Sequence, residues 1–341
     1  MNTISKLILS SKRVEVPVAE VRKVGLTLMC EGGCNKDYAG KIIDHLIEAD
    51  LSGVESHGIM RVLQYHDEYQ RGYILPNVIP KISAVNSTNI SVDGQGGLGI
   101  PALQIATEAG IDSAKTNGIT AIAVRNTGHT GRLGAFAENA AQAGCLFIAC
   151  GGGARDRSRM VTPYGGRKAL LPTNPWCLGI PGGSLGPVVL DCATSQIAGG
   201  WIYAAKRAGA TLPKGAIVDC NGRPTQNPND YFAGGAILPK GGVLGYGLAT
   251  MGELICDAML GPATVESNTF ILMVDTLRYR EEGALKDAAE AILQELRDCP
   301  AADGFDRVEV PGERERTRRD GAHTIKLPEK IWSALQAGGE I

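Results

Sequence analysis

Residues 82–126 decide the fold class; they read ISAVNSTNISVDGQGGLGIPALQIATEAGIDSAKTNGITAIAVRN. The first part, 82–94, mixes β-branched residues with Asn, Ser and Gly, which predicts a strand and a turn. Residues 101–118 are rich in Ala and predict a helix, and residues 119–126 predict another strand. A strand, a helix and a strand in this order indicate an α/β domain.

The same alternation continues toward the C-terminus. Apolar, β-branched runs predict strands at 145–153, 176–181, 187–193 and 269–275. Longer Ala- and Leu-rich runs predict helices at 135–144, 197–209, 246–260 and 282–299. The sequence therefore predicts a central α/β domain.

The two ends of the chain differ from this centre. Apolar residues recur at helical spacing within residues 17–71, and we expect one buried face from Tyr38, Ile42, Ile43, Leu46 and Ile47 and a later one from Ile59, Val62, Leu63, His66 and Tyr69. The two prolines of 73–81 then interrupt the pattern. Residues 327–338 predict a short helix that packs back on this N-terminal region.

Composition limits the class of partner. The formal net charge is −2, with 44% hydrophobic and 21% charged residues, so no global basic field favours nucleic acid or an anionic membrane. No apolar run reaches the ~18 residues of a membrane span, and the N-terminal residues lack a signal-peptide pattern. We expect a cytoplasmic protein whose partner is a small molecule.

The cysteines predict free thiols. Nine is an odd number, and no Cys-x-x-Cys pair occurs, which is typical of a reduced compartment. Cys30 and Cys34 have no second Cys or His cluster to complete a metal site, so no metal is expected.

One glycine pattern resembles a dinucleotide fingerprint. Gly94, Gly96 and Gly99 follow a predicted strand and precede a predicted helix. The strand of 119–126, however, ends in Arg125 and Asn126 rather than in an acidic residue that would bind a ribose. The spacing therefore favours a turn or a close packing contact over a Rossmann site.

Two histidine motifs are candidates for acid–base chemistry. Ser56-His57-Gly58 is followed by Arg61, and at helical spacing an imidazole and a guanidinium would share a face that suits a 2-oxo or 2-hydroxy acid. The alternative is a helix cap at Ser56 with surface residues after it. His129 stands among glycines between a predicted strand and a predicted helix, either as a ligand-facing residue or as a structural turn.

A third motif places a carboxylate at a strand end. Residues 190–195 read LDCATS, so Asp191 closes an apolar strand and small residues follow it. This arrangement allows a flat cofactor to approach the backbone, although Asp, Thr and Ser also cap helices routinely.

Taken together, eight collinear segments resemble the malate/L-lactate dehydrogenase family, which includes ureidoglycolate, sulfolactate and diketogulonate enzymes and piperideine-2-carboxylate reductase. They are SHGIMR (56–61), NTGHTG (126–131), TPYGG (162–166), LPTNPW (171–176), LDCATS (190–195), DCNGRPTQNP (219–228), LGYGLATMGELI (244–255) and VPGERE (310–315). The resemblance spans nearly the whole chain and is more specific than any single motif.

The resemblance implies a non-Rossmann α/β fold and a nicotinamide cofactor, NAD or NADP. A helical domain of residues 1–75 and 285–341 would pack on a cofactor-binding domain of 76–284 with a mixed sheet, and the enzyme would be a homodimer. The activity would be hydride transfer between NAD(P)H and a small 2-oxo or 2-hydroxy carboxylic acid. A cyclic imine reductase and a weakly active metabolite-binding homologue are the alternatives.

Site residues also follow from the resemblance. The substrate contacts would be Ser56, Arg61 and Thr173, and the proton would be exchanged by His129, with His57 and Asp191 as alternatives. The cofactor contacts would be Asp191, Cys192, Ala193, Leu244, Gly312 and Glu313.

One position departs from the family pattern. Leu244 stands where the family carries a lysine that contacts the cofactor. Lys240 or an arginine of residues 154–160 could replace that charge.

Overall fold

The computed structural model describes residues 12–154 and 156–338, and it separates into two compact units. The terminal unit comprises Lys12–Ala149, Cys177–Asp191 and Phe270–Ile341. The inserted unit contains Cys150–Trp176 and Cys192–Thr269. The division into residues 1–75 with 285–341 and residues 76–284 stays a prediction.

A seven-stranded mixed sheet confirms the expected α/β class. Its order is β2-β3-β4-β11-β5-β6-β7, with β2 and β3 antiparallel and β3 and β4 parallel. The strands are β2 Lys81–Asn86, β3 Asn89–Asp93, β4 Ile119–Thr127, β5 Cys145–Gly152, β6 Trp176–Ile180, β7 Val188–Cys192 and β11 Ser267–Asp275. The boundaries between the units fall within β5, β6, β7 and β11.

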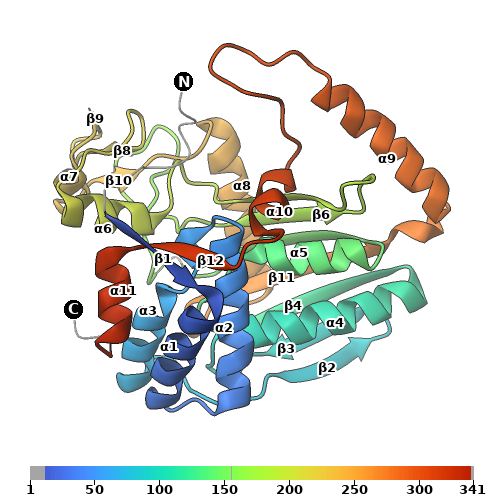
Figure 1. Ribbon diagram of the computed structural model, residues 1–341, viewed down its shortest axis with the longest axis horizontal. Helices are drawn as coiled ribbons and strands as arrows, with labels where there is room; N and C mark the ends of the chain where they lie inside the picture. Colours follow the sequence, from blue (N-terminus) through green and yellow to red (C-terminus); the bar gives the residue numbers. More distant parts are fainter. Residues whose placement is uncertain (1–11, 155, 339–341) are drawn as a thin grey trace. The chain divides into compact units, whose positions relative to one another are not determined.

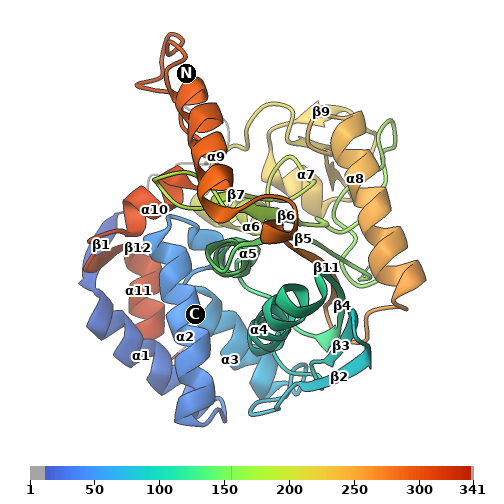
Figure 2. The same cartoon turned by 90° about the vertical axis from the view of Figure 1, so that its right-hand side faces the viewer.

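Two helices cover one face of this sheet. They are α4 (Gly99–Asn117), which crosses from β3 to β4, and α5 (Leu133–Gln142). Figure 2 shows both of them between the sheet and the helices formed by the chain ends. Glycine permits this close approach at Gly110, where a Cβ atom would lie 2.5 Å from Cδ1 of Ile122.

The two chain ends associate, as the sequence predicted. Strand β1 (Arg13–Pro17) pairs antiparallel with β12 (Thr324–Pro328), and Figure 1 shows α11 beside them. The helices here are α1 Val18–Glu31, α2 Lys36–Leu51, α3 Arg61–Gln70, α10 Glu313–Arg319 and α11 Glu329–Gln336. The two strands were not expected, because each is short and lies next to a helix start.

The buried faces of these helices agree only partly with the helical pattern. In α2 the residues Ile42, Ile43, Leu46 and Ile47 are buried as predicted, and the Asn35 side chain caps its start by accepting from Tyr38 N at 2.9 Å. On the later face Ile59, Val62 and Tyr69 are buried, whereas Leu63 and His66 are only partly buried. The buried residues of α3 are Val62, Tyr65, Glu68 and Tyr69, so polar side chains face inward.

The terminal unit also contains two short 3₁₀ turns, Glu55–His57 and Thr276–Arg278, and helix α9 (Glu282–Arg297). The inserted unit has a three-stranded sheet of order β10-β8-β9 and a core of its own. Its elements are α6 Gly199–Ala208, β8 Ile217–Val218, β9 Pro224–Thr225, α7 Pro228–Phe232, β10 Ala236–Ile237 and α8 Val243–Glu253. Helix α8 continues as a wider π-helical turn, Leu254–Met259.

The glycine pattern at residues 94–99 is a packing contact. Gly94 N donates to Arg125 O at 2.8 Å, and Gly99 N donates to His129 O at 3.0 Å. A Cβ atom at Gly99 would lie 2.8 Å from Gly128 O. The glycine loop therefore packs directly against residues at the end of β4. This contact agrees with the close-packing interpretation and with a non-Rossmann fold.

Candidate active site

The two histidine motifs meet in the terminal unit. The rings of His57 and His129 stack with their centroids 5.3 Å apart. His57 ends a short 3₁₀ turn (Glu55–His57), and His129 lies between β4 and α5. The structure thus brings together two residues that are 72 positions apart in the sequence.

Each imidazole is held through Nδ1. Ser56 Oγ lies 2.9 Å from Nδ1 of His57, and Tyr65 Oη lies 2.6 Å from Nδ1 of His129. Gly131 N also donates to Nδ1 of His129 at 3.3 Å, so the neutral ring carries its proton on Nε2. Among the described residues no hydrogen bond reaches Nε2 of His129, which leaves this nitrogen for a ligand.

Arg61 is held close to this pair, but not by one continuous helix. Gly58 is extended and separates the 3₁₀ turn from α3, so the predicted i, i+4 relation of His57 and Arg61 on a single helix is wrong. Instead, Arg61 Nε donates to Ser56 O at 2.6 Å and its Nη1 to Gln64 Oε1. Both acceptors are uncharged.

Desolvation and positive charge keep both imidazoles neutral. Loss of hydration, followed by the charge of Arg61, lowers the pKa of His57 to about 3. The same two causes and His57 itself hold the pKa of His129 well below its usual value. At neutral pH both rings are therefore uncharged, and Arg61 supplies the positive charge.

Asp191 lies near the end of β7 and has a different environment. Its Oδ2 accepts from Gly134 N, the second residue of α5, at 2.7 Å. Asp191 is an exposed residue, but protein atoms around its carboxyl group reduce its hydration and raise its pKa. This environment stabilises the protonated form of the carboxyl group relative to that of an exposed aspartate.

The C-terminal candidates lie at the start of α10. Gly312 has a φ of +91° and precedes the helix, a conformation that favours glycine. Both oxygens of Glu313 already accept hydrogen bonds, Oε1 from Arg297 at 2.6 Å and Oε2 from Val310 N at 3.2 Å.

The other candidates form a second group, in the inserted unit. Thr173 O accepts from Thr194 N at 3.0 Å, and Thr194 O accepts from Lys240 N at 2.8 Å. Lys240 O then accepts from Gly245 N at 2.9 Å, next to Leu244, which is 69% exposed. Cys192 and Ala193 precede Thr194 directly and are partly exposed. The sequence candidates of this unit are thus joined by one chain of backbone hydrogen bonds.

Residues 16–336 match the family model described as malate/L-lactate dehydrogenase. This chain belongs to that family. An L-lactate dehydrogenase of Cupriavidus necator is 29% identical to it over 95% of this chain and 96% of the relative. A Δ¹-pyrroline-2-carboxylate/Δ¹-piperideine-2-carboxylate reductase of Pseudomonas putida is 33% identical over 74% and 73% of the two chains.

The fold comparison agrees with the sequence comparison. The crystal structure of a dehydrogenase from Sinorhizobium meliloti has a TM-score of 0.86 at 29% identity, covering 98% of this chain and 100% of that chain. The family predicted from the eight motifs is therefore confirmed, together with its dehydrogenase fold.

Sequence reasoning missed two residues of the terminal-unit site. Tyr65 lies one helical turn after Arg61, a spacing that could have identified it. Asp50, at the end of α2, was missed because only the fold brings it to the histidine turn. Its Oδ2 accepts from Ile59 N at 2.7 Å, and a Cβ atom at Gly58 would lie 2.0 Å from its Oδ1.

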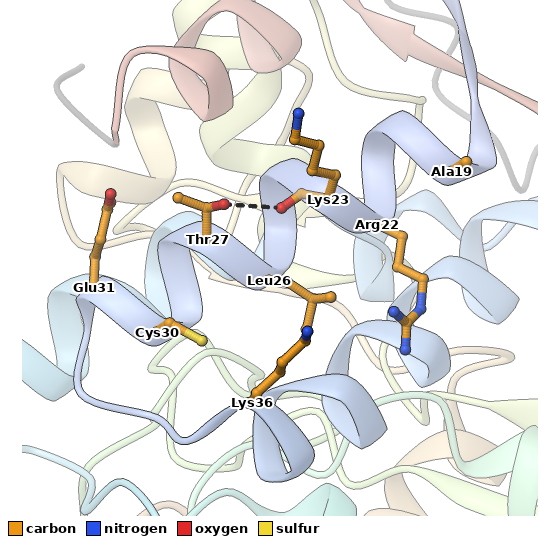
Figure 3. Close-up of a pocket in the computed structure, with 8 residues that line it drawn as sticks. All are labelled: Ala19, Arg22, Lys23, Leu26, Thr27, Cys30, Glu31 and Lys36. Carbon is orange, nitrogen blue, oxygen red and sulfur yellow. Dashed lines mark hydrogen bonds between the residues drawn. The ribbon is translucent and has the colours of Figure 1, made fainter.

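A surface groove on α1 contains none of these residues. Figure 3 shows its lining, which includes Arg22, Lys23, Cys30 and Lys36. Arg22 is already paired with Asp44 at 2.7 Å. Within residues 12–154 and 156–338, no three His, Cys, Asp or Glu side chains lie close enough together to form a metal site. None of the helices in these residues has the length and hydrophobicity of a membrane span.

The ionisation of Asp50 should affect stability in a defined direction. Desolvation raises its pKa to about 8, so its stabilising contribution is full below its ordinary pKa and is lost as the pH rises through about 8. Asp50→Asn cannot ionise, and its free energy of unfolding relative to wild type should therefore increase between about pH 5 and pH 8. Chemical denaturation at several pH values measures this.

Two further variants serve as controls. Asp50→Ala leaves the buried Ile59 N–H without its acceptor and should be about 1–3 kcal/mol less stable than Asp50→Asn at every pH, because neither variant can ionise at this position. Asp44→Asn, on the exposed side of the same helix, should give a difference that does not vary over this range. A flat difference for Asp50→Asn would contradict the role of Asp50.

Proposed function

We propose that this protein transfers a hydride between NADH or NADPH and C2 of a small 2-oxo or 2-hydroxy carboxylic acid. The observation that carries the proposal is the stacked, uncharged pair of His57 and His129 beside Arg61. A carbonyl substrate of this class needs a proton at its oxygen and a cation at its carboxylate. Membership of a dehydrogenase family supports the reaction type.

Arg61 is proposed to bind the substrate carboxylate. Among the described residues it forms no salt bridge, and its hydrogen-bond acceptors, Ser56 O and Gln64 Oε1, are neutral. A guanidinium can exchange such partners for the two oxygens of a carboxylate. A bound carboxylate would also offset the positive charge that depresses the pKa of His129. Ser56 and Thr173 are the remaining proposed substrate contacts.

His129 is proposed to exchange the proton through Nε2. Tyr65 and Gly131 hold its Nδ1, so the ring is fixed while Nε2 stays open. Substrate binding would raise the pKa of the imidazole, because a negative charge stabilises the imidazolium. His57 and Asp191 are the alternative groups for this proton.

The proposed cofactor contacts come from both units. In the terminal unit they are Asp191, Gly312 and Glu313, and in the inserted unit Cys192, Ala193 and Leu244. A nicotinamide cofactor would supply or accept the hydride. The donor set fits a dinucleotide phosphate: Arg316 donates to Pro187 O, has no salt bridge among the described residues, and would lie 3.0 Å from a Cβ at Gly312.

One specific observation favours the reduction of a cyclic imine as a second candidate. An imine nitrogen needs a protonated acid, and the raised pKa of Asp191 supports that role. The Pseudomonas putida relative is named for such substrates. A weakly active metabolite-binding homologue is supported only by Leu244.

The wider assignments remain proposals. We infer a homodimer in the cytoplasm, as the family resemblance implies. Helix α9 supports an assembly, because Ile292 and Leu296 on it are 62% and 50% exposed.

A substrate screen tests the proposed reaction. Purified protein is assayed with NADH and with NADPH at 340 nm against 2-oxo acids, cyclic imine carboxylates and uncharged ketones. Turnover of a carboxylate substrate and none of the uncharged ketones is expected. Turnover of imines alone would select the second candidate, and tight binding without turnover would select the third.

Replacing His129 should remove the proton exchange. His129→Gln should lower kcat by about 10²- to 10⁴-fold, because general acid–base catalysis contributes that much. His66→Gln, on α3, is the control and should retain activity. Near wild-type turnover in a folded His129→Gln protein would transfer the role to His57 or Asp191.

Replacing Arg61 should weaken binding of the carboxylate. Arg61→Met should cost about 1.5–3 kcal/mol in kcat/KM, the value of a hydrogen bond to a charged group. Arg71→Met removes an exposed ion pair with Asp67 from the same helix and should change little. Equal losses for charged and uncharged substrates in Arg61→Met would show that Arg61 is structural.

Leu244 offers a gain-of-function test in the inserted unit. If a phosphate lies there, Leu244→Lys should lower the Kd of NADH or NADPH by about 10- to 150-fold. Calorimetry measures this for both cofactors. An unchanged Kd, together with a marked weakening in Lys240→Met, would mean that Lys240 already fills the role.

A further inference from the structure

Four charged side chains form a closed ion cluster inside the terminal unit. Arg132 contacts Glu48 through Nη2 at 2.8 Å and Glu138 at 3.4 Å. Arg319 contacts the same two carboxylates, at 2.7 Å and 2.6 Å. These residues come from α2, from the turn before α5, from α5 and from α10. The cluster thus joins three segments that are far apart in the sequence.

The cluster is largely shielded from water, and its charges cancel. The side chains of Arg132 and Glu138 are 4% and 8% exposed, and those of Glu48 and Arg319 are 24% exposed. Two guanidinium groups face two carboxylates. Removing these charges from water costs free energy that their mutual attraction only partly offsets. Stabilisation of the fold is therefore not a sufficient explanation for the cluster.

The cluster controls the backbone that holds Asp191. Arg132 is fixed twice, by its side chain in the cluster and by its N–H, which donates to His45 Nε2 at 2.9 Å. Two residues later, Gly134 N donates to Asp191 Oδ2 at 2.7 Å. A Cβ at Gly134 would lie 2.5 Å from Arg132 Nη1 and 3.1 Å from Asp191 Oδ2, so the guanidinium and the carboxyl group flank the same small space.

We propose that the ion cluster of Glu48, Arg132, Glu138 and Arg319 is a positioning device for Asp191: it fixes the backbone donor that holds the carboxyl group and supplies that group with no net counter-charge. The inference rests on the proposed function, in which Asp191 is a candidate proton donor. Arg132 alone would favour an ionised Asp191. Glu48 within the cluster opposes that effect.

The electrostatic surroundings of Asp191 agree with this charge balance. Desolvation raises its pKa most, and the charges of Glu315 on α10 and Glu48 on α2 raise it further. The Gly134 N–H and the charge of Arg132 act in the opposite direction. Neutralising one member of the cluster should therefore change the pKa of Asp191 in a direction set by the sign of the charge removed.

Three variants test the proposal. Glu48→Gln leaves the cluster with a net positive charge and should lower the pKa of Asp191, whereas Arg319→Met leaves a net negative charge and should raise it, each by about 0.5–1 pH unit. The double variant restores neutrality and should return the pKa toward the wild-type value. Glu48 and Arg319 are the more exposed members of the cluster, so their substitution disturbs the core least. The pKa shift of Asp191 has a predicted direction in each single variant, so one folded variant is enough to test the proposal.

Two measurements separate this proposal from the proposed function. NMR of ¹³C-carboxyl-labelled aspartate follows the titration of Asp191 directly, with Asp191→Asn to assign its signal, and the pH dependence of kcat is measured in parallel. Asp275→Asn, which breaks a buried ion pair with Lys115 elsewhere in the unit, is the matched control and should shift neither.

The outcomes are distinct. Opposite shifts that cancel in the double variant support the proposal, and if the pH profile of kcat stays unchanged, they also show that Asp191 is not the proton donor. The proposal would be overturned if the pKa of Asp191 shifted in the same direction in both single variants or in neither. It would also be overturned if the double variant differed from wild type as much as the single variants do.

Discussion

Close backbone contact between the glycine loop after β3 and the end of β4 is the constraint on which the site depends. Gly96 N donates to Asn126 O at 2.9 Å, Gly128 N to Gly97 O at 2.8 Å, and Gly99 N to His129 O at 3.0 Å. These bonds form only because the loop carries no side chains where the two segments meet. They fix the peptide of His129, and through it the ring that stacks on His57 and contacts Tyr65.

Few uncompensated charges lie around the proposed site in the terminal unit. Both imidazoles are neutral, the pKa of Asp191 is raised by desolvation, and the charges of the cluster around Arg132 cancel one another. Beside the two histidines lies Arg61, which is proposed to bind the substrate carboxylate and whose hydrogen-bond acceptors are uncharged. A carboxylate that pairs with it has few competing charges nearby, which suits the small acids named for the relatives.

Much of the fold could be predicted from the sequence, because strand and helix periods are local properties. The central strands, α4, α5 and the helical faces of α2 agree with the pattern. The pattern was insufficient in α3, where Tyr65 and Glu68 are buried, while Leu63 and His66, which helical spacing placed on the predicted face, are only partly buried. Polar burial is decided by partners on other segments, and Tyr65 is buried because its hydroxyl meets His129.

The family, the α/β class and the two histidine motifs could be identified from the sequence, because they are carried by collinear residues. The relation between the two motifs depends on the tertiary structure, in which Gly58 divides the predicted helix and Asp50 holds the following turn. The tertiary structure also places a balanced set of charges behind Asp191. The physical reason is that the pKa of a group depends on solvent exclusion and on charges within a few ångströms, and chain folding alone sets both.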